Sequence, residues 1–131
     1  MVAAAHLDPW NGQEYARHSS MQYRQAQEAL QRIDLRGFER ILDIGCGNGD
    51  ITKYLSERTS DGLVIGVDVS PSMIDLAQRT HATPGRLEFR HVSADALEFH
   101  EEFDLVCSFS TMRPRKLPLS LRALVILALR P

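Results

Sequence analysis

Apolar residues gather in short runs separated by glycine, proline and polar residues, and this pattern predicts four β-strands in the middle of the chain. The strands are expected at residues 40–44, 63–67, 86–92 and 103–109. Between the first three strands, apolar positions recur at helical spacing, over residues 48–58 and again after Ser70-Pro71-Ser72. Strands that alternate with helices indicate βαβ units, so the expected fold class is α/β with a mostly parallel sheet.

An N-terminal helix is predicted because apolar and small residues recur at mostly helical spacing over residues 10–33, with Ser19 or Ser20 as its N-cap. The aromatic side chains of this segment either pack against the core or face a ligand as part of a lid, and the spacing leaves both open.

A length of 131 residues suits one domain. We divide it into a helical N-terminal cap at residues 1–35, a ligand-binding core at residues 36–112 and a divergent tail at residues 113–131. A formal net charge of -2 gives no reason to expect a nucleic-acid or membrane partner, and no apolar segment approaches the ~20 residues that cross a bilayer. The start of the chain lacks the features of a secretory signal, and its two cysteines do not form a disulfide framework, so we expect a cytoplasmic protein.

Three alternating glycines, Gly45, Gly47 and Gly49, follow the first strand and precede a helix. Glycines there permit positive φ and close approach of the backbone to a ligand, and the helix offers unpaired N–H groups. Asp43 lies just before this turn, where its carboxylate suits a cation or a hydroxyl and repels a pyrophosphate. The pattern predicts a ligand-binding turn.

Two further aspartates follow predicted strands. Asp68 ends the second strand, nineteen residues after Gly49, which matches the acidic residue that binds ribose hydroxyls in nucleotide sites. Asp95 follows the third strand and either accepts a hydrogen bond from an adenine amine or serves as a turn or N-cap residue. Met73, on the helix after Asp68, either packs against an adenine face or belongs to the core.

Four motifs in order resemble the class I S-adenosylmethionine-dependent methyltransferases: Ile-Leu-Asp-Ile-Gly-Cys-Gly-Asn-Gly at 41–49, Val-Asp-Val-Ser-Pro-Ser-Met at 67–73, Ser-Ala-Asp-Ala at 93–96 and Phe-Asp-Leu-Val at 103–106. The resemblance implies a Rossmann-like sheet and S-adenosyl-L-methionine as the cofactor. It places Asp43 and Gly45 near the methionine portion, Asp68 at the ribose, and Asp95 with Ala96 at the adenine. The cofactor-binding candidates are Asp43, Gly45, Cys46, Gly47, Asn48, Gly49, Asp68, Val69, Met73, Asp95, Ala96 and Ser108.

The N-terminal segment is similar to the N-terminal helices of small-molecule carboxyl methyltransferases of the trans-aconitate and juvenile hormone acid type. This similarity implies a helical lid over the cofactor and makes Trp10, Tyr15 and Gln22 candidates for contact with a small-molecule acceptor. A carboxylate acceptor is already anionic at neutral pH, so we expect no catalytic base and no metal. S-Adenosylmethionine carries an ammonium and a sulfonium but no phosphate, which suits Asp43.

The tail departs from the family pattern. Relatives continue after the fourth strand to a Leu-Lys-Pro-Gly-Gly-like turn and three more strands of a seven-stranded sheet, whereas this chain stops at Pro131 after five basic residues and no acidic one. Either residues 128–131 are a compressed form of that turn, or everything after Met112 is unrelated sequence. We therefore expect an apparently truncated, incomplete sheet with an uncovered edge that permits self-association.

Three functions are compatible with these residues. The first is a methyltransferase that acts on a small acid or another oxygen acceptor. The second is a truncated, non-catalytic product that binds only the cofactor or a partner. The third, an NAD-dependent oxidoreductase, is disfavoured by Asp43 and by the motif around Asp95.

Overall fold

Five parallel strands form one sheet in the computed structural model, which describes residues 12–92, 103–109 and 121–126, and side chains within 21–92 and 103–109. The strands are β1 (Arg40–Ile44), β2 (Leu63–Asp68), β3 (Leu87–His91), β4 (Phe103–Ser108) and β5 (Leu121–Ile126), and the described helices are α2 (Gly12–Leu30), α3 (Asp50–Arg58) and α4 (Pro71–His81). The spatial order is β3-β2-β1-β4-β5. The predicted α/β, Rossmann-like class is confirmed.

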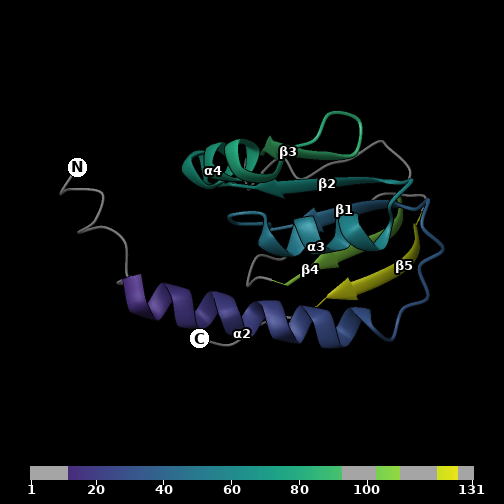
Figure 1. Ribbon diagram of the computed structural model, residues 1–131, viewed down its shortest axis with the longest axis horizontal. Helices are drawn as coiled ribbons and strands as arrows, with labels where there is room; N and C mark the ends of the chain where they lie inside the picture. The colour runs from purple at the N-terminus through teal and green to yellow at the C-terminus, as the bar shows by residue number, and fades with distance from the viewer. Residues whose placement is uncertain (1–11, 93–102, 110–120, 127–131) are drawn as a thin grey trace.

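The chain changes direction across the sheet after β3. From β1 it moves outward through β2 to β3, and it then returns to the other side of β1 to form β4. The strand order therefore reverses between β1 and β4, and ligands of open parallel sheets bind at the carboxyl ends of strands beside such a point. All strand arrows point toward the left of the view in Figure 1, where the turn after β1 lies.

Local sequence accounts for where two helices begin. Gly49 adopts a left-handed conformation directly before α3. Ser70 caps α4 by accepting a hydrogen bond from the backbone N–H of Met73, and Pro71 occupies a first-turn position where its missing N–H costs nothing. The N-terminal helix was predicted, but its N-cap was wrong: α2 begins at Gly12, so Ser19 and Ser20 lie inside it.

The fifth strand was not predicted. β5 pairs in parallel with β4, from Leu121 opposite Phe103 to Ile126 opposite Ser108. No strand was predicted after Met112 because prolines and basic residues precede this segment and Arg122 interrupts its apolar run. Pairing with the buried strand β4 stabilises this segment as a strand, although its own sequence pattern does not predict one. The turn expected at residues 128–131 lies outside the described residues.

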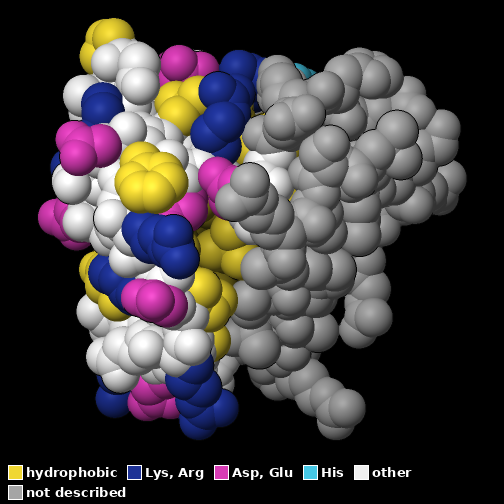
Figure 2. All heavy atoms as spheres, turned by 90° about the vertical axis from the view of Figure 1, so that its right-hand side faces the viewer, with side chains coloured by type: hydrophobic (Ala, Val, Ile, Leu, Met, Phe, Trp, Pro, Cys, Tyr) yellow, Lys and Arg dark blue, Asp and Glu magenta, His cyan; other side chains and the backbone are white. Residues whose placement is uncertain are grey.

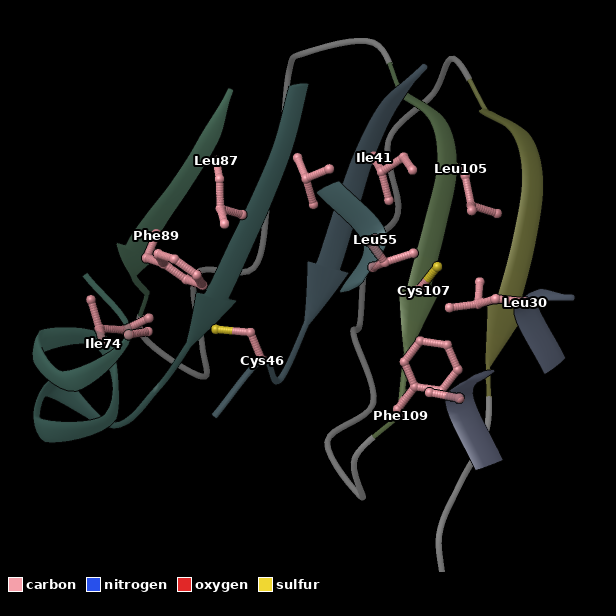
Figure 3. Packing of buried hydrophobic residues seen from close by; sticks show 13 residues of the cluster. Leu30, Ile41, Cys46, Leu55, Ile74, Leu87, Phe89, Leu105, Cys107 and Phe109 are labelled. Atoms are coloured by element: carbon pink, nitrogen blue, oxygen red, sulfur yellow. The ribbon is translucent and has the colours of Figure 1, made fainter. Parts of the chain in front are cut away.

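One face of the sheet packs against all three described helices. Ala26 and Leu30 from α2, Leu55 from α3, and Ile74 from α4 join a buried layer of strand side chains. In Figure 3, Leu30 and Phe109 lie beside β4, Leu55 lies over the centre, and Ile74 and Phe89 lie at the β3 end. Burying each large aliphatic side chain contributes roughly 1.5–3 kcal/mol, so this layer fixes the helices that frame the carboxyl ends of the strands. The strand residues of the opposite face form a second buried cluster, comprising Leu42, Ile44, Ile65, Val67, Phe103 and Val106.

The surface at the amino ends of the strands carries a mixture of side-chain types. On its described part, acidic and basic side chains are interspersed with apolar ones (Figure 2). Phe38, in the loop before β1, is 63% exposed. Among the described helices, none combines the length and apolar character that a membrane span requires.

Candidate functional site

The turn after β1 is tied to the end of β2 by backbone hydrogen bonds. The N–H groups of Gly45 and Cys46 both donate to the Val67 carbonyl oxygen, at 2.8 and 3.0 Å. Gly45, Gly47 and Gly49 have φ values of +75°, +57° and +87°, a region that other residues rarely adopt. The glycine pattern is therefore a conformational requirement of the turn.

The glycines differ in what surrounds them. A Cβ on Gly49 would lie 2.8 Å from ring atoms of Phe89, so this glycine allows α3 to approach β3 closely. A Cβ on Gly47 would meet no atom within 4 Å. Gly49 thus serves packing, whereas Gly47 keeps its backbone accessible from an open space.

Asp43 is a buried carboxyl at the centre of the sheet. It lies in β1 between Gly66 of β2 and Cys107 of β4, and it is 2% exposed. The hydroxyl of Thr52 in α3 donates a hydrogen bond to its Oδ2 atom at 2.8 Å. Burial raises the pKa of Asp43 to about 7; the bond from Thr52 opposes this shift, and the nearby charge of Asp68 adds to it.

Asp68 joins the glycine turn to the start of α4. Its Oδ2 atom accepts a hydrogen bond from the Gly47 N–H at 2.8 Å, and its Oδ1 atom accepts one from the Ser70 N–H at 2.9 Å. The side chain is held by two backbone donors while the residue stays partly exposed. An ionised carboxylate offers about four acceptor positions, so each oxygen retains capacity for a ligand hydroxyl.

The two cysteines are buried free thiols. Burial raises the pKa of both thiols, and the neighbouring Asp43 raises it further in each case. A raised pKa keeps a thiol protonated at neutral pH, which makes both poor nucleophiles. Cys46 therefore has a packing role in the turn, and its sulfur lies close to Gly66 of β2.

A pocket opens beside the turn, between β1, α2 and α3. The described residues that line it are Gln22, Tyr23, Asp43, Gly45, Cys46, Gly47, Asn48, Asp50, Ile51 and Phe109. The structure thus brings one acceptor candidate, Gln22, together with five of the predicted cofactor-binding residues. Tyr23, Asp50, Ile51 and Phe109 were not among the site predictions. Asp50 and Ile51 directly follow the last glycine, and Phe109 ends a predicted strand at the same edge of the sheet. The positions of these three residues in the sequence were therefore the signal that could have identified them.

Among the described residues, five further site predictions do not line this pocket, namely Gly49, Asp68, Val69, Met73 and Ser108. Val69, 39% exposed, directly follows β2, Met73 lies in the first turn of α4, and Ser108 is a buried residue at the end of β4, opposite Ile44. Gly49 borders the turn as the cap of α3. Trp10, Asp95, Ala96 and the side chain of Tyr15 are outside what the structure describes.

Arg58, the last residue of α3, connects this helix to the C-terminal end of α2. The guanidinium donates hydrogen bonds to the carbonyl oxygens of Leu30 and Ile33, each at 3.1 Å. It also lies over the ring of Tyr54, which makes an edge contact with Tyr23 at 5.9 Å between centroids. Arg58 thus contacts the C-terminal end of α2 and the residues just after it, while Tyr54 contacts the middle of the helix through Tyr23.

The fold, the glycine turn and the two aspartates together define a class of protein. A family model described as a methyltransferase domain matches residues 41–126, and the chain belongs to this family. The predicted class I S-adenosylmethionine-dependent methyltransferase is thereby confirmed, and with it S-adenosyl-L-methionine as the cofactor of the domain.

Individual relatives agree with this assignment. The chain is 33% identical over 112 residues to a trans-aconitate 2-methyltransferase of Escherichia coli O1:K1 / APEC, covering 86% of this chain and 42% of the relative. It is 32% identical over 105 residues to a malonyl-[acyl-carrier protein] O-methyltransferase of Acetivibrio thermocellus, covering 79% and 37%. The chain thus spans about two-fifths of the length of these curated relatives.

Solved structures give the same fold. An S-adenosylmethionine-dependent methyltransferase from Mesorhizobium loti matches with a TM-score of 0.53 and 29% identity, covering 65% of this chain and 39% of that one. A Haemonchus contortus phosphoethanolamine N-methyltransferase, solved with S-adenosylhomocysteine, matches in fold with a TM-score of 0.58 at 24% identity, over 69% of this chain and 19% of that one.

Proposed function

We propose that the chain transfers a methyl group from S-adenosyl-L-methionine to a small-molecule acceptor, and that the acceptor atom is a carboxylate oxygen. The observation that carries this proposal is the position of the Asp43 carboxyl, which lines a pocket beside an open glycine turn at the reversal point of a parallel sheet.

The residues of the pocket fit this cofactor. Asp43 supplies a carboxyl group for the ammonium of the methionine portion, directly or through water. Gly47 leaves space where any side chain would stand in the way of a ligand. A pyrophosphate would lie near Asp43, Asp50 and Asp68, and this charge pattern disfavours a dinucleotide.

Asp68 is proposed to accept hydrogen bonds from the ribose hydroxyls. Its two backbone partners hold the carboxylate in one orientation before the ligand arrives, which reduces the conformational cost of binding. Asp95 and Ala96 are proposed at the adenine, together with Val69 and Met73, and Ser108 at the end of β4 completes the cofactor set.

The bound cofactor would supply a methyl group already activated on a sulfonium, so the task of this chain is to bind and orient. Holding donor and acceptor in line accounts for much of the rate enhancement in such a displacement. Gln22 lies at the pocket and is proposed to contact the acceptor, with Trp10 and Tyr15 as further candidates. An anionic acceptor needs no general base.

The names of two relatives support a carboxylate acceptor. One is a trans-aconitate 2-methyltransferase and the other a malonyl-[acyl-carrier protein] O-methyltransferase, and both named substrates carry free carboxyl groups. The cytoplasm remains the predicted location.

The test is release of S-adenosylhomocysteine when the protein and S-adenosylmethionine are mixed with a panel of di- and tricarboxylic acids and matched amines and alcohols. We expect release with one or more acids, lost in the Asp68→Ala variant and retained in Asp75→Ala, which changes an exposed carboxyl on α4. Release with amines alone would overturn the carboxylate assignment. Cofactor binding without release on any acceptor would favour the non-catalytic alternative.

A further inference from the structure

The hydroxyl of Thr52 reaches the Asp43 carboxyl from the neighbouring helix. We propose that Thr52 is a positioning residue, whose hydroxyl fixes the orientation of Asp43 so that the carboxyl meets the ammonium group of the cofactor. This inference rests on the proposed function and assigns a role to a residue outside the glycine motif.

The two side chains form a buried pair between a strand and a helix. Thr52 is fully buried in α3, Asp43 is 2% exposed in β1, and the hydroxyl lies 2.8 Å from Oδ2. A helical threonine often bonds to the carbonyl one turn earlier. Here the Thr52 hydroxyl donates to Asp43 in the neighbouring strand, so the bond links α3 to the site.

The neighbours of Asp43 in the sheet explain why it depends on this partner. Gly66 on one side has no side chain, and Cys107 on the other offers a weak thiol donor. A β-branched threonine has restricted χ1 freedom, so its hydroxyl is held in place. With Oδ2 bonded to Thr52, Oδ1 is the oxygen that a ligand in the pocket would meet.

Several groups around Asp43 act on its ionisation. Asp68 at the end of β2 disfavours the charged form, the buried thiols of Cys46 and Cys107 lie near it, and Tyr23 of α2 and Asp50 of α3 line the same pocket. A cationic ligand is bound best by the ionised carboxyl. Donation from Thr52 favours that form, so losing the hydroxyl weakens binding by orientation and by ionisation alike.

Titration of the full chain with S-adenosylmethionine between pH 5 and 7.5, where the cofactor's amino group is mostly charged, tests this role. Thr52→Val removes the hydroxyl and keeps the shape. We expect an affinity about tenfold lower, consistent with the loss of one hydrogen bond to a charged group, and a rise of affinity with pH that is displaced upward. Thr52→Ser keeps a hydroxyl and should restore both the affinity and the pH profile.

A double-variant comparison separates positioning from general damage. If Thr52 acts through Asp43, then Thr52→Val added to Asp43→Asn should lower the affinity no further. An equal loss in that background, or a folded Thr52→Val protein with wild-type affinity and pH profile, would overturn the proposal. Where Thr52→Val does not fold, Thr52→Ala removes the hydroxyl without demanding space and carries the same expectations. Failure of the wild type itself to bind would instead reject the proposed function.

Discussion

At the scale of single residues, the proposed ligand-facing role of Asp43 comes with a cost to the stability of the fold. Burial raises its pKa to about 7, well above the usual range of an exposed aspartate. The native protein therefore keeps this proton over a range of pH in which the unfolded chain releases it. The free energy of unfolding must then fall as pH rises from about 4 to about 7.

The Asp43→Asn variant should not show this fall in unfolding free energy, because asparagine does not ionise. We expect the difference in unfolding free energy between variant and wild type to grow in favour of the variant across that pH range, by up to roughly 4 kcal/mol. Urea denaturation at a series of pH values measures it, and Asp75→Asn, at an exposed ion pair, serves as the control. Parallel stability curves for wild type and Asp43→Asn would show that the carboxyl ionises normally in the native state.

Gly47 and Gly85 offer a matched pair of substitutions. Both have positive φ, +57° and +75°, and a Cβ at either position meets nothing within 4 Å. Alanine should cost both variants a similar amount of stability, about 1–2 kcal/mol, because the backbone strain is alike. In calorimetry, Gly47→Ala alone should lose at least about tenfold in S-adenosylmethionine affinity. Equal affinities would place the ligand away from the turn.

The sequence predicted the glycine turn and its two aspartates, because the glycine spacing and the ends of apolar runs are local features. It could not predict the partner of Asp43. Thr52 is nine positions away on a different element, and only the packing of α3 against β1 brings its hydroxyl to the carboxyl. The raised pKa of Asp43 results from burial in the folded protein, so the sequence alone could not predict it either.

At the scale of secondary structure, Arg58 adds polar contacts to the apolar packing that holds α2 against the core. Replacing Arg58 with leucine removes two hydrogen bonds to carbonyl oxygens at the end of α2. We expect a loss of about 2–3 kcal/mol in unfolding free energy, since hydrogen bonds from charged groups exceed neutral ones. Chemical denaturation measures it.

Arg79→Leu provides the control for this prediction. Arg79 pairs with Asp75 on the exposed surface of α4, with 67% of its side chain accessible, and its loss should change stability by no more than about 0.5 kcal/mol. Similar stabilities for the two variants would mean that the Arg58 contacts add nothing to the attachment of α2.

Four of the five strands could be predicted from local sequence, and the fifth could not. β1, β2, β3 and β4 have continuous or alternating apolar sequences bounded by turn residues, and each was predicted within one or two positions. β5 carries a charge within its run and follows a proline-rich segment, so the decisive information lies in its pairing with β4. This pairing joins segments that are far apart in the sequence, so the local pattern of residues 121–126 does not reveal it.

At the scale of the whole molecule, the chain spans about two-fifths of the length of its curated relatives, and its sheet order is β3-β2-β1-β4-β5. Within the described strands, β3 and β5 each pair on one side. Unpaired strand edges promote association. We therefore keep self-association as a prediction, which light scattering over a range of protein concentrations would test; a constant monomer mass would contradict it.

The central claim is that the glycine turn, Asp43 and Asp68 form a site for S-adenosylmethionine. Calorimetric titration of the full chain with this cofactor tests it most directly, with Asp68→Ala and the control Asp75→Ala compared after circular dichroism has established that each is folded. The account predicts binding by the wild type and the control, at least about tenfold weaker binding by Asp68→Ala, and no heat with NAD. A folded wild type that binds no S-adenosylmethionine, or that binds NAD tightly instead, would contradict it.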